Sequence, residues 1–145
     1  MQLVEKKVLV AHTPAQMFAL VDDVEHYPRF LPWCGKADVC ARDDGRQVAS
    51  LTIDYFKIRQ RFTTCNTIVP DRSIEMELVD GPFESLRGTW LFLPLGDIGC
   101  KIEFSLRYQF SSSLLEKVIG PVFGHISGSL VDAFIKEADR VYGNE

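Results

Sequence analysis

Residues 112–142 read SSLLEKVIGPVFGHISGSLVDAFIKEADRVY, and this stretch decides the fold. A glycine inside a helix costs about 1 kcal/mol relative to alanine, and an interior proline costs about 3 kcal/mol. The stretch therefore predicts either one long helix that covers a cavity for an apolar guest, or two helices that meet at Gly120-Pro121 and pack closely through small residues. Its apolar residues recur at spacings of three and four, so they share one helical face: Leu115, Val118, Ile119, Val122, Phe123, Ile126, Leu130, Phe134, Ala138 and Val141.

The composition is that of an ordinary soluble globular protein. Of the 145 residues, 46% are apolar and 25% are charged, which excludes a disordered or collagen-like chain. A chain of this length forms a single domain, here residues 1–145, with a substantial core. The net charge of −4 gives no overall attraction to nucleic acid or to an anionic membrane, so no DNA partner is expected.

The chain shows neither a secretion signal nor a metal-binding pattern. Its start, MQLVEKKVLV, lacks the apolar region of a signal peptide, and its uninterrupted apolar runs fall short of the roughly 18 residues that a spanning helix needs. We therefore expect it in the cytoplasm, or peripheral to the inner face of the membrane. The four cysteines are expected to be reduced thiols, because no CxxC pair or zinc spacing occurs among Cys34, Cys40, Cys65 and Cys100.

The first third of the chain predicts a strand, a helix and an apolar loop. Residues 2–11 are rich in β-branched residues and contain no breakers, and Thr13-Pro14-Ala15-Gln16 then supplies a helix N-cap, a first-turn proline and a capping-box glutamine. The helix is expected to end near Tyr27, because Pro28 disfavours helical geometry in the residue before it. The loop Phe30-Leu31-Pro32-Trp33 is too apolar to lie in water and either packs on the core or forms the rim of a pocket.

The middle of the chain has the period of two that is typical of strands. The turn residues between the apolar runs, such as Asp43-Asp44-Gly45, favour hairpins between neighbours and hence an antiparallel sheet. Gly88 on an inner face suggests a bulge or bend that curls the sheet. Six strands are predicted, at residues 36–43, 46–55, 57–69, 72–79, 83–94 and 99–110.

Three groups of short motifs carry a resemblance to a known family. They are Asp23-Val24 with Tyr27-Pro28 and Phe30–Cys34, then Val79–Phe83 with Leu86, Gly88 and Trp90, and then Val122-Phe123, Ala133-Phe134 and Val141-Tyr142. With the order of elements, they make nearly the whole chain similar to the START-like superfamily and, within it, to the coenzyme Q-binding and RatA family of ribosome-association toxins. The resemblance implies an α+β helix-grip fold, in which a curved antiparallel sheet wraps around the C-terminal helix with a hydrophobic cavity between them.

The resemblance also implies a ligand. It suggests a tunnel that holds ubiquinone (coenzyme Q) or a similar polyprenyl lipid without chemistry on it, in support of respiratory electron transport, and no further cofactor or metal. An apolar tail gains about 0.8 kcal/mol per buried CH₂. For every candidate, an ordinary place in the core is the alternative. The candidates are residues that point inward in the predicted alternation of the strands, together with residues of the apolar loop and of the C-terminal helix. They are Phe30, Leu31, Trp33, Met76, Phe83, Trp90, Phe104, Tyr108, Val122, Phe123 and Ile126.

A ribosome-binding toxin is the alternative function that the resemblance implies, with the large ribosomal subunit as partner and subunit association as the step it blocks. Lys57, Arg59 and Arg61 are predicted to project from one face of a strand, where they either meet phosphates or form a solvated sheet face. Tyr55 and Phe56, in the adjoining turn, either touch a membrane or partner or cap the core.

Catalysis finds little support, although related START-like proteins include polyketide cyclases. His12 and His26 are expected to be exposed, and His125, beside the apolar stripe, is the sole candidate acid or base. A surface or rim position is the alternative for His125. Asp80 precedes Gly81-Pro82 and is interpreted as a turn residue. We therefore expect a binding protein rather than an enzyme.

Overall fold

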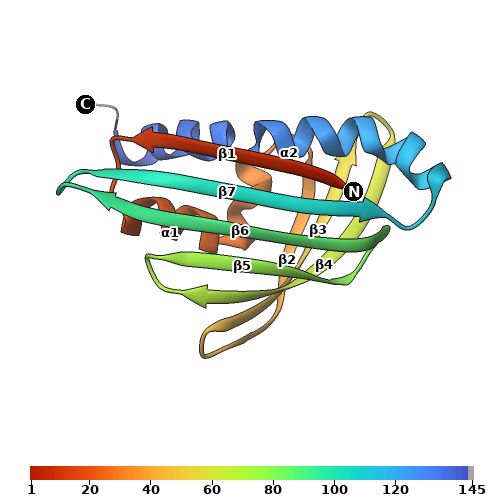
Figure 1. The fold of residues 1–145 in the computed structure, drawn as a ribbon, viewed down its shortest axis with the longest axis horizontal. Helices are drawn as coiled ribbons and strands as arrows, with labels where there is room; N and C mark the ends of the chain where they lie inside the picture. The colour runs from red at the N-terminus through yellow and green to blue at the C-terminus, as the bar shows by residue number, and fades with distance from the viewer. Residues whose placement is uncertain (144–145) are drawn as a thin grey trace.

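The computed structural model describes residues 1–143, in which one long helix lies along a curved sheet (Figure 1). The sheet is antiparallel throughout, with the strand order β1-β7-β6-β5-β4-β3-β2. This is the helix-grip arrangement that the sequence predicts. The elements are β1 (Gln2–Val10), α1 (Pro14–Asp22), the 3₁₀ helix η1 (Val24–Arg29), β2 (Cys34–Asp43), β3 (Arg46–Tyr55), β4 (Ile58–Val69), β5 (Ser73–Asp80), β6 (Phe83–Leu95), β7 (Gly99–Phe110) and α2 (Ser113–Tyr142).

The capping box at the start of α1 is confirmed, but the predicted end of the helix is wrong. The Gln16 amide nitrogen donates to Thr13 Oγ1 at 3.2 Å, and the Thr13 nitrogen donates to Gln16 Oε1 at 2.9 Å. The α-helix stops at Asp22, and η1 carries the chain through Tyr27 and Pro28. Proline has no N–H to continue an α-helix, so this segment forms the tighter 3₁₀ turn.

The hairpin between β3 and β4 also departs from the predicted boundaries. Tyr55 pairs with Ile58, which leaves Phe56 and Lys57 as a two-residue turn with positive φ angles of 49° and 65°. Such turns usually contain Asn-Gly or Asp-Gly, because both central residues need φ above zero. The sequence signal for a turn was therefore missing, and Lys57 lies in the turn rather than on the strand.

Gly88 is confirmed on the inner face but not as a bulge. Its pairing with Met76 and Leu106 is regular, and the register shift in β6 lies between Phe83 and Ser85. A Cβ on Gly88 would lie 2.6 Å from Met76 Cε and 3.0 Å from Leu106 Cδ1. The absence of a side chain at Gly88 therefore leaves room for the Met76 and Leu106 side chains to pack at this position of β6.

α2 is one continuous helix, so the two-helix alternative is wrong. Ser112 Oγ caps it by accepting from the Leu115 nitrogen at 3.2 Å, and Pro121 lies within it. Close packing does not explain Gly124 or Gly128, since a Cβ at either position would have nothing within 4 Å. Ile119, Phe123, Ile126, Phe134 and Ala138 of the stripe are buried, while Val118 and Val141 near its ends stay exposed.

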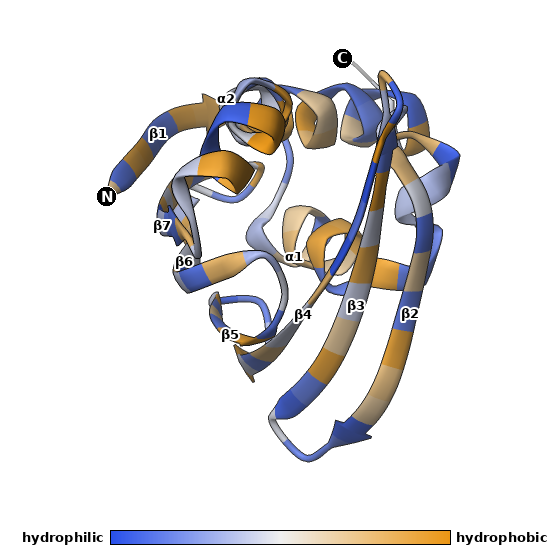
Figure 2. Cartoon of the chain, turned by 90° about the vertical axis from the view of Figure 1, so that its right-hand side faces the viewer, coloured by the Kyte–Doolittle hydropathy of each residue, from blue (hydrophilic) through white to orange (hydrophobic). Residues whose placement is uncertain are grey.

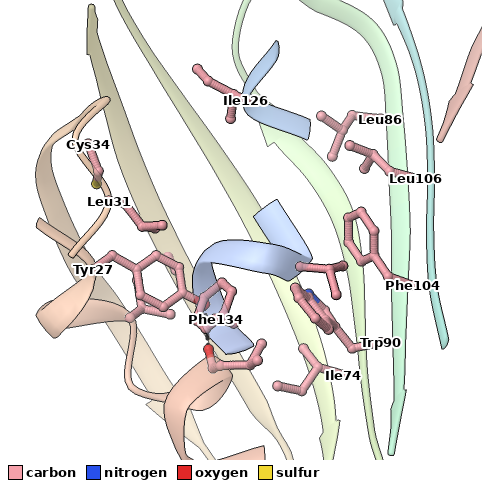
Figure 3. Packing of buried hydrophobic residues seen from close by; sticks show 14 of the residues in the cluster. Tyr27, Leu31, Cys34, Ile74, Leu86, Trp90, Phe104, Leu106, Ile126 and Phe134 are labelled. Carbon is pink, nitrogen blue, oxygen red and sulfur yellow. Dashed lines mark hydrogen bonds between the residues drawn. The ribbon is translucent and has the colours of Figure 1, made fainter. Parts of the chain in front are cut away.

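Hydropathy separates the two faces of α2 (Figure 2). By length and composition alone, α2 is long and apolar enough to cross a membrane. One such helix is weak evidence, because the core helix of a soluble protein meets the same criterion. Here its stripe packs on the concave face of the sheet, where Trp90 meets Phe104 and Phe134 at ring-centroid distances of 4.6 and 5.4 Å (Figure 3). The helix therefore completes the core.

Candidate functional site

An apolar cavity of about 80 Å³ lies between the concave face of the sheet and α2. It draws side chains from η1, from β3 to β7 and from α2, together with Trp33 ahead of β2. Its lining is predominantly aromatic and aliphatic, as ligand sites for apolar molecules are. The lining residues are Val24, Tyr27, Trp33, Ala49, Leu51, Phe62, Thr64, Asn66, Met76, Leu86, Trp90, Phe104, Leu106, Phe123, Ile126, Ser127, Leu130 and Phe134.

Only some of the predicted tunnel residues line this cavity. Phe83 and Tyr108 pack instead in an aromatic cluster with Phe123, at centroid distances of 5.0 and 4.7 Å, so they are core residues here. Phe30 and Leu31 line an outer groove, and Val122 is half-buried outside the lining. The residues that do line the cavity are Trp33, Met76, Trp90, Phe104, Phe123 and Ile126.

The sequence reasoning missed the contribution of β4. Phe62, Thr64 and Asn66 alternate inward along this strand, and all three are buried. A strict period of two from Phe62 would have found them. The signal was weak, because threonine and asparagine do not mark a buried face by hydropathy. Tyr27, expected at the end of the first helix, and Phe134, part of the apolar stripe, also line the cavity, although neither was among the predicted tunnel residues.

The polar side chains of β4 form a buried hydrogen-bonded corner with β3. Thr64 Oγ1 donates to Asn66 Oδ1 at 2.8 Å, and Asn66 Nδ2 donates to Gln47 Oε1 at 3.0 Å. Gln47 Nε2 in turn donates to the backbone oxygen of Asp22 at 3.3 Å. Buried polar groups need such partners, since an unpaired one costs about 1–3 kcal/mol. The cavity therefore has one polar end in an otherwise apolar wall.

An outer groove of about 470 Å³ runs between the loop at residues 30–33 and α2. Trp33 lines both the groove and the cavity, so its ring forms part of the wall between them. On the rim, His125 stacks on Tyr55 with 6.1 Å between ring centroids and 7° between planes. His125 is exposed, which agrees with a rim position, and it does not line the cavity.

The remaining histidines lie away from the cavity. His26 is exposed, as expected, and contacts Asp23. The expectation for His12 is wrong, because this side chain is buried and its Nε2 lies 2.7 Å from Asp139 Oδ1 on α2. β1 brings the segment before α1 against the end of α2, which sequence neighbours alone could not reveal.

Burial keeps the ionisable groups near the cavity neutral. It raises the pKa of the Tyr27 phenol, with the charge of Asp22 adding to the effect, and the phenol donates to the Val21 carbonyl. Burial also raises the pKa of the Cys34 thiol to about 11. At neutral pH both groups are protonated. Among the described residues that line the cavity, none is an acid, a lysine, an arginine or a histidine.

Of the three basic residues predicted to project from one strand face, Lys57, Arg59 and Arg61, only two lie there. Arg59 and Arg61 are exposed on the outer face of β4, whereas Lys57 lies in the turn. Arg59 Nη1 lies 3.5 Å from Asp54 Oδ2, so part of its charge is already balanced. Phe56 is 76% exposed and packs only beside Tyr55, which excludes the core-capping alternative for it.

Comparison with known proteins places this architecture in a family. Residues 10–135 match the family described as polyketide cyclase/dehydrase and lipid transport. The chain is 42% identical over 143 residues to the ribosome association toxin RatA of Vibrio cholerae, covering 99% of each chain. It is 32% identical over 142 residues to the mitochondrial coenzyme Q-binding protein COQ10 of Drosophila melanogaster, covering 95% of this chain and 59% of that one.

A solved structure supports the fold. A START superfamily protein from Mycobacterium smegmatis superimposes with a TM-score of 0.78, at 22% identity over 96% of this chain and 98% of that one. At this identity the likeness concerns the fold alone. The family match and the RatA relative extend over most of the chain. The chain therefore belongs to the polyketide cyclase/dehydrase and lipid-transport family.

Proposed function

We propose that this protein binds a hydrophobic ligand, ubiquinone or a similar polyprenyl lipid, in the cavity under α2, and does no chemistry on it. The observation that carries the proposal is the cavity itself, whose wall is predominantly aromatic and aliphatic. The name of the COQ10 relative points to the same class of ligand. Such a carrier would support respiratory electron transport from the cytoplasm or from the inner face of the membrane.

The size of the cavity makes ligand entry a matter of side-chain movement. Pockets that hold a small organic molecule usually measure about 300–1,000 Å³, and the empty cavity has about 80 Å³. Met76 and Leu130 line it and are only half-buried. An unbranched methionine adapts readily to a new neighbour. We therefore infer that these two side chains move aside when a ligand enters.

The proposed lack of catalysis rests on the position of His125. This residue is the one candidate acid or base, and it lies on the rim of the outer groove. A general acid or base must come within hydrogen-bonding reach of the reacting group. The neutral tyrosine and thiol beside the cavity supply no charge in its place.

The test is extraction of the purified protein followed by mass spectrometry for a co-purifying quinone. Ala49→Leu, which adds bulk inside the cavity, should lower the quinone load at least fivefold in a protein that still folds. Ala41→Leu makes the same change at an exposed position of β2 and should leave the load unchanged. Equal loads in the wild type and Ala49→Leu would contradict binding in this cavity.

Association with the large ribosomal subunit is the second candidate. It is favoured by the near full-length RatA relative and by the exposed arginines of β4. Contacts with phosphates weaken steeply as salt rises. In gradient sedimentation, Arg59→Glu with Arg61→Glu should abolish association at low salt. Arg87→Glu removes an exposed arginine already paired with Glu77 and should leave it intact. Association that survives the double change and added salt would exclude the basic face.

A further inference from the structure

The polar corner lies at one end of the cavity. On the inner face of β4 the side chains change from a phenyl ring at Phe62 to a hydroxyl at Thr64 and an amide at Asn66. Asn66 is 4% exposed, and its neighbour Gln47 is 2% exposed. A buried amide in an apolar wall is costly unless all of its hydrogen-bonding capacity is used. A hydrogen-bond donor or acceptor that no protein group uses therefore indicates which kind of ligand atom can bind here.

The backbone oxygen of Asp22 fixes the orientation of the whole hydrogen-bonded chain. A carbonyl can only accept, so the Gln47 side-chain nitrogen must face it, and Gln47 Oε1 must face Asn66. Asn66 then turns its nitrogen to Gln47 and its oxygen to Thr64, which has to donate. The amide orientations follow from this anchor rather than from an arbitrary assignment.

This orientation leaves a donor and an acceptor side by side. Asn66 Nδ2 carries two hydrogens, and within residues 1–143 the bond to Gln47 uses one of them. The Thr64 hydroxyl spends its hydrogen on Asn66 and keeps lone pairs on its oxygen. Ser127, another polar residue of the lining, directs its hydroxyl to the Phe123 carbonyl of its own helix at 2.9 Å, and Tyr27 donates to the Val21 carbonyl. Trp33 and Trp90 also bring indole N–H donors to the wall, and within residues 1–143 neither donates to a protein group. Asn66 differs from them because its unused N–H lies beside an acceptor, the Thr64 oxygen.

The polar corner is remote from the outer groove. Asn66 pairs with Gln47 on β3, whereas Ile53 of the same strand pairs with Cys34, next to Trp33. Gln47 and Ile53 are six positions apart, which corresponds to about 20 Å along a strand. Trp33 is the residue that lines both the cavity and the groove. A molecule that enters from the groove therefore passes along the cavity before it reaches the polar corner.

We propose that Asn66, supported by Thr64 and Gln47, is the head-group site of the cavity. It takes a ligand whose ring bears an oxygen acceptor, such as a quinone carbonyl, and the ligand lies with its ring at Asn66 and its tail toward Trp33. The Asn66 N–H donates to the ring oxygen, and the Thr64 oxygen accepts from a ring hydroxyl when the ligand is a quinol. This assignment rests on the proposed lipid-binding function and adds the anchoring residue and the direction of the ligand.

The first experiment compares two probes that share a tail. Decylubiquinone carries ring oxygens and decylbenzene carries none, and both are titrated into the protein. Asn66→Leu should weaken decylubiquinone binding about tenfold, the effect of one lost hydrogen bond, and leave decylbenzene within twofold. Thr67→Val, a polar deletion at an exposed position of the same strand, should change neither. Thr64→Val should weaken decylubiquinone less and serves if Asn66→Leu does not fold.

The outcomes separate the two proposals. If the wild type binds both probes and Asn66→Leu leaves their ratio unchanged, the head-group site is overturned while lipid binding stands. If the wild type binds neither probe, the proposed function is overturned and the head-group assignment with it. A loss of both probes in Asn66→Leu, in a protein with an unchanged melting temperature, also contradicts a role limited to the ring.

The two tryptophans of the chain report the direction of the ligand. Trp33 lies at the groove end, and Trp90 on β6 is opposite Ile74, two residues along β5 from the partner of Asn66. A quinone ring near a tryptophan quenches its fluorescence. Decylubiquinone should therefore quench Trp33→Phe, which retains Trp90, more strongly than Trp90→Phe, which retains Trp33. The opposite order would overturn the head-first direction.

Discussion

Two phenylalanines of one hairpin show how unequally this fold stabilises its side chains. Phe62 on β4 is 9% exposed and packs edge-on against Phe83 and Phe123. Phe56, six positions earlier, is 76% exposed and has a left-handed backbone with φ of 49°. Burial in the core stabilises Phe62, whereas the one aromatic contact of Phe56 within the described chain is with Tyr55, at a ring-centroid distance of 4.3 Å. The comparison teaches that packing in the core favours a large apolar residue on β4, whereas no core packing favours one in the turn before it.

The largest expected effect comes from removing the buried ring. Phe62→Ala should lower the free energy of unfolding by about 3 kcal/mol, because it removes apolar surface and enlarges the existing cavity. Urea denaturation measures this loss. A loss below about 1 kcal/mol would show that the wall of the cavity collapses around the missing ring.

The same contrast between buried and exposed positions applies to charged side chains, beginning with the ion pair of Glu137 and Arg140. Glu137 is 8% exposed and accepts from Arg140 Nε at 2.8 Å and Arg140 Nη2 at 2.7 Å, and this pairing lowers the Glu137 pKa. A depressed carboxylate pKa stabilises the protein above the pKa of the unfolded chain, and this contribution is lost as pH falls through the folded pKa. Arg140→Leu should therefore destabilise the protein at pH 7 and remove part of its acid sensitivity, as measured by urea denaturation between pH 7 and pH 3.

The exposed pair of Arg87 with Glu77 is the matched control for this prediction. Both side chains are well exposed, and such surface pairs contribute about 0–1 kcal/mol. Arg87→Leu should leave both the stability at pH 7 and its pH dependence close to those of the wild type. Equal effects of Arg87→Leu and Arg140→Leu would show that the burial of Glu137 does not increase the contribution of its ion pair to stability.

A better turn should make the protein more stable. Replacing Phe56 with asparagine and Lys57 with glycine provides residues that accept positive φ, and the gain should be about 1 kcal/mol. Thermal unfolding measures it as a higher Tm. An unchanged or lower Tm would mean that Phe56 makes a stabilising contact after all.

The smallest effect on the free energy of unfolding is expected at the exposed phenylalanine, Phe56. Phe56→Ala keeps a side chain at positive φ and removes only exposed surface, so the free energy of unfolding should change by less than about 0.5 kcal/mol. The same urea titration that measures Phe62→Ala provides the contrast. A loss comparable to that of Phe62→Ala would break the comparison.

Local sequence patterns predicted much of this structure, and the reasons for the exceptions are physical. The alternation that ends at Phe110 identified β7, and the three-and-four spacing identified α2, because long periodic segments specify their own buried face. Trp90 and Phe104 were placed correctly in the cavity wall for the same reason. These residues are large, apolar and in phase.

Other parts of the site depend on contacts that no local pattern contains. Asn66 is polar, and its role at the cavity becomes visible only when β3 brings Gln47 beside it. His12 is buried only because α2 ends against it with Asp139, more than a hundred residues later. Phe83 and Tyr108 have the same inward phase as the cavity residues, and only the position of Phe123 assigns them to the neighbouring cluster.

The narrow cavity has a consequence for the life of the protein in a cell. Only about 80 Å³ of the cavity is open, so without a ligand the protein leaves little unfilled space in its apolar interior. Chaperones and proteases act on chains that expose apolar surface. Under the proposed lipid-binding function, we therefore expect the half-life of the protein to be independent of lipid supply, so that its cellular level follows its synthesis rather than the abundance of the ligand.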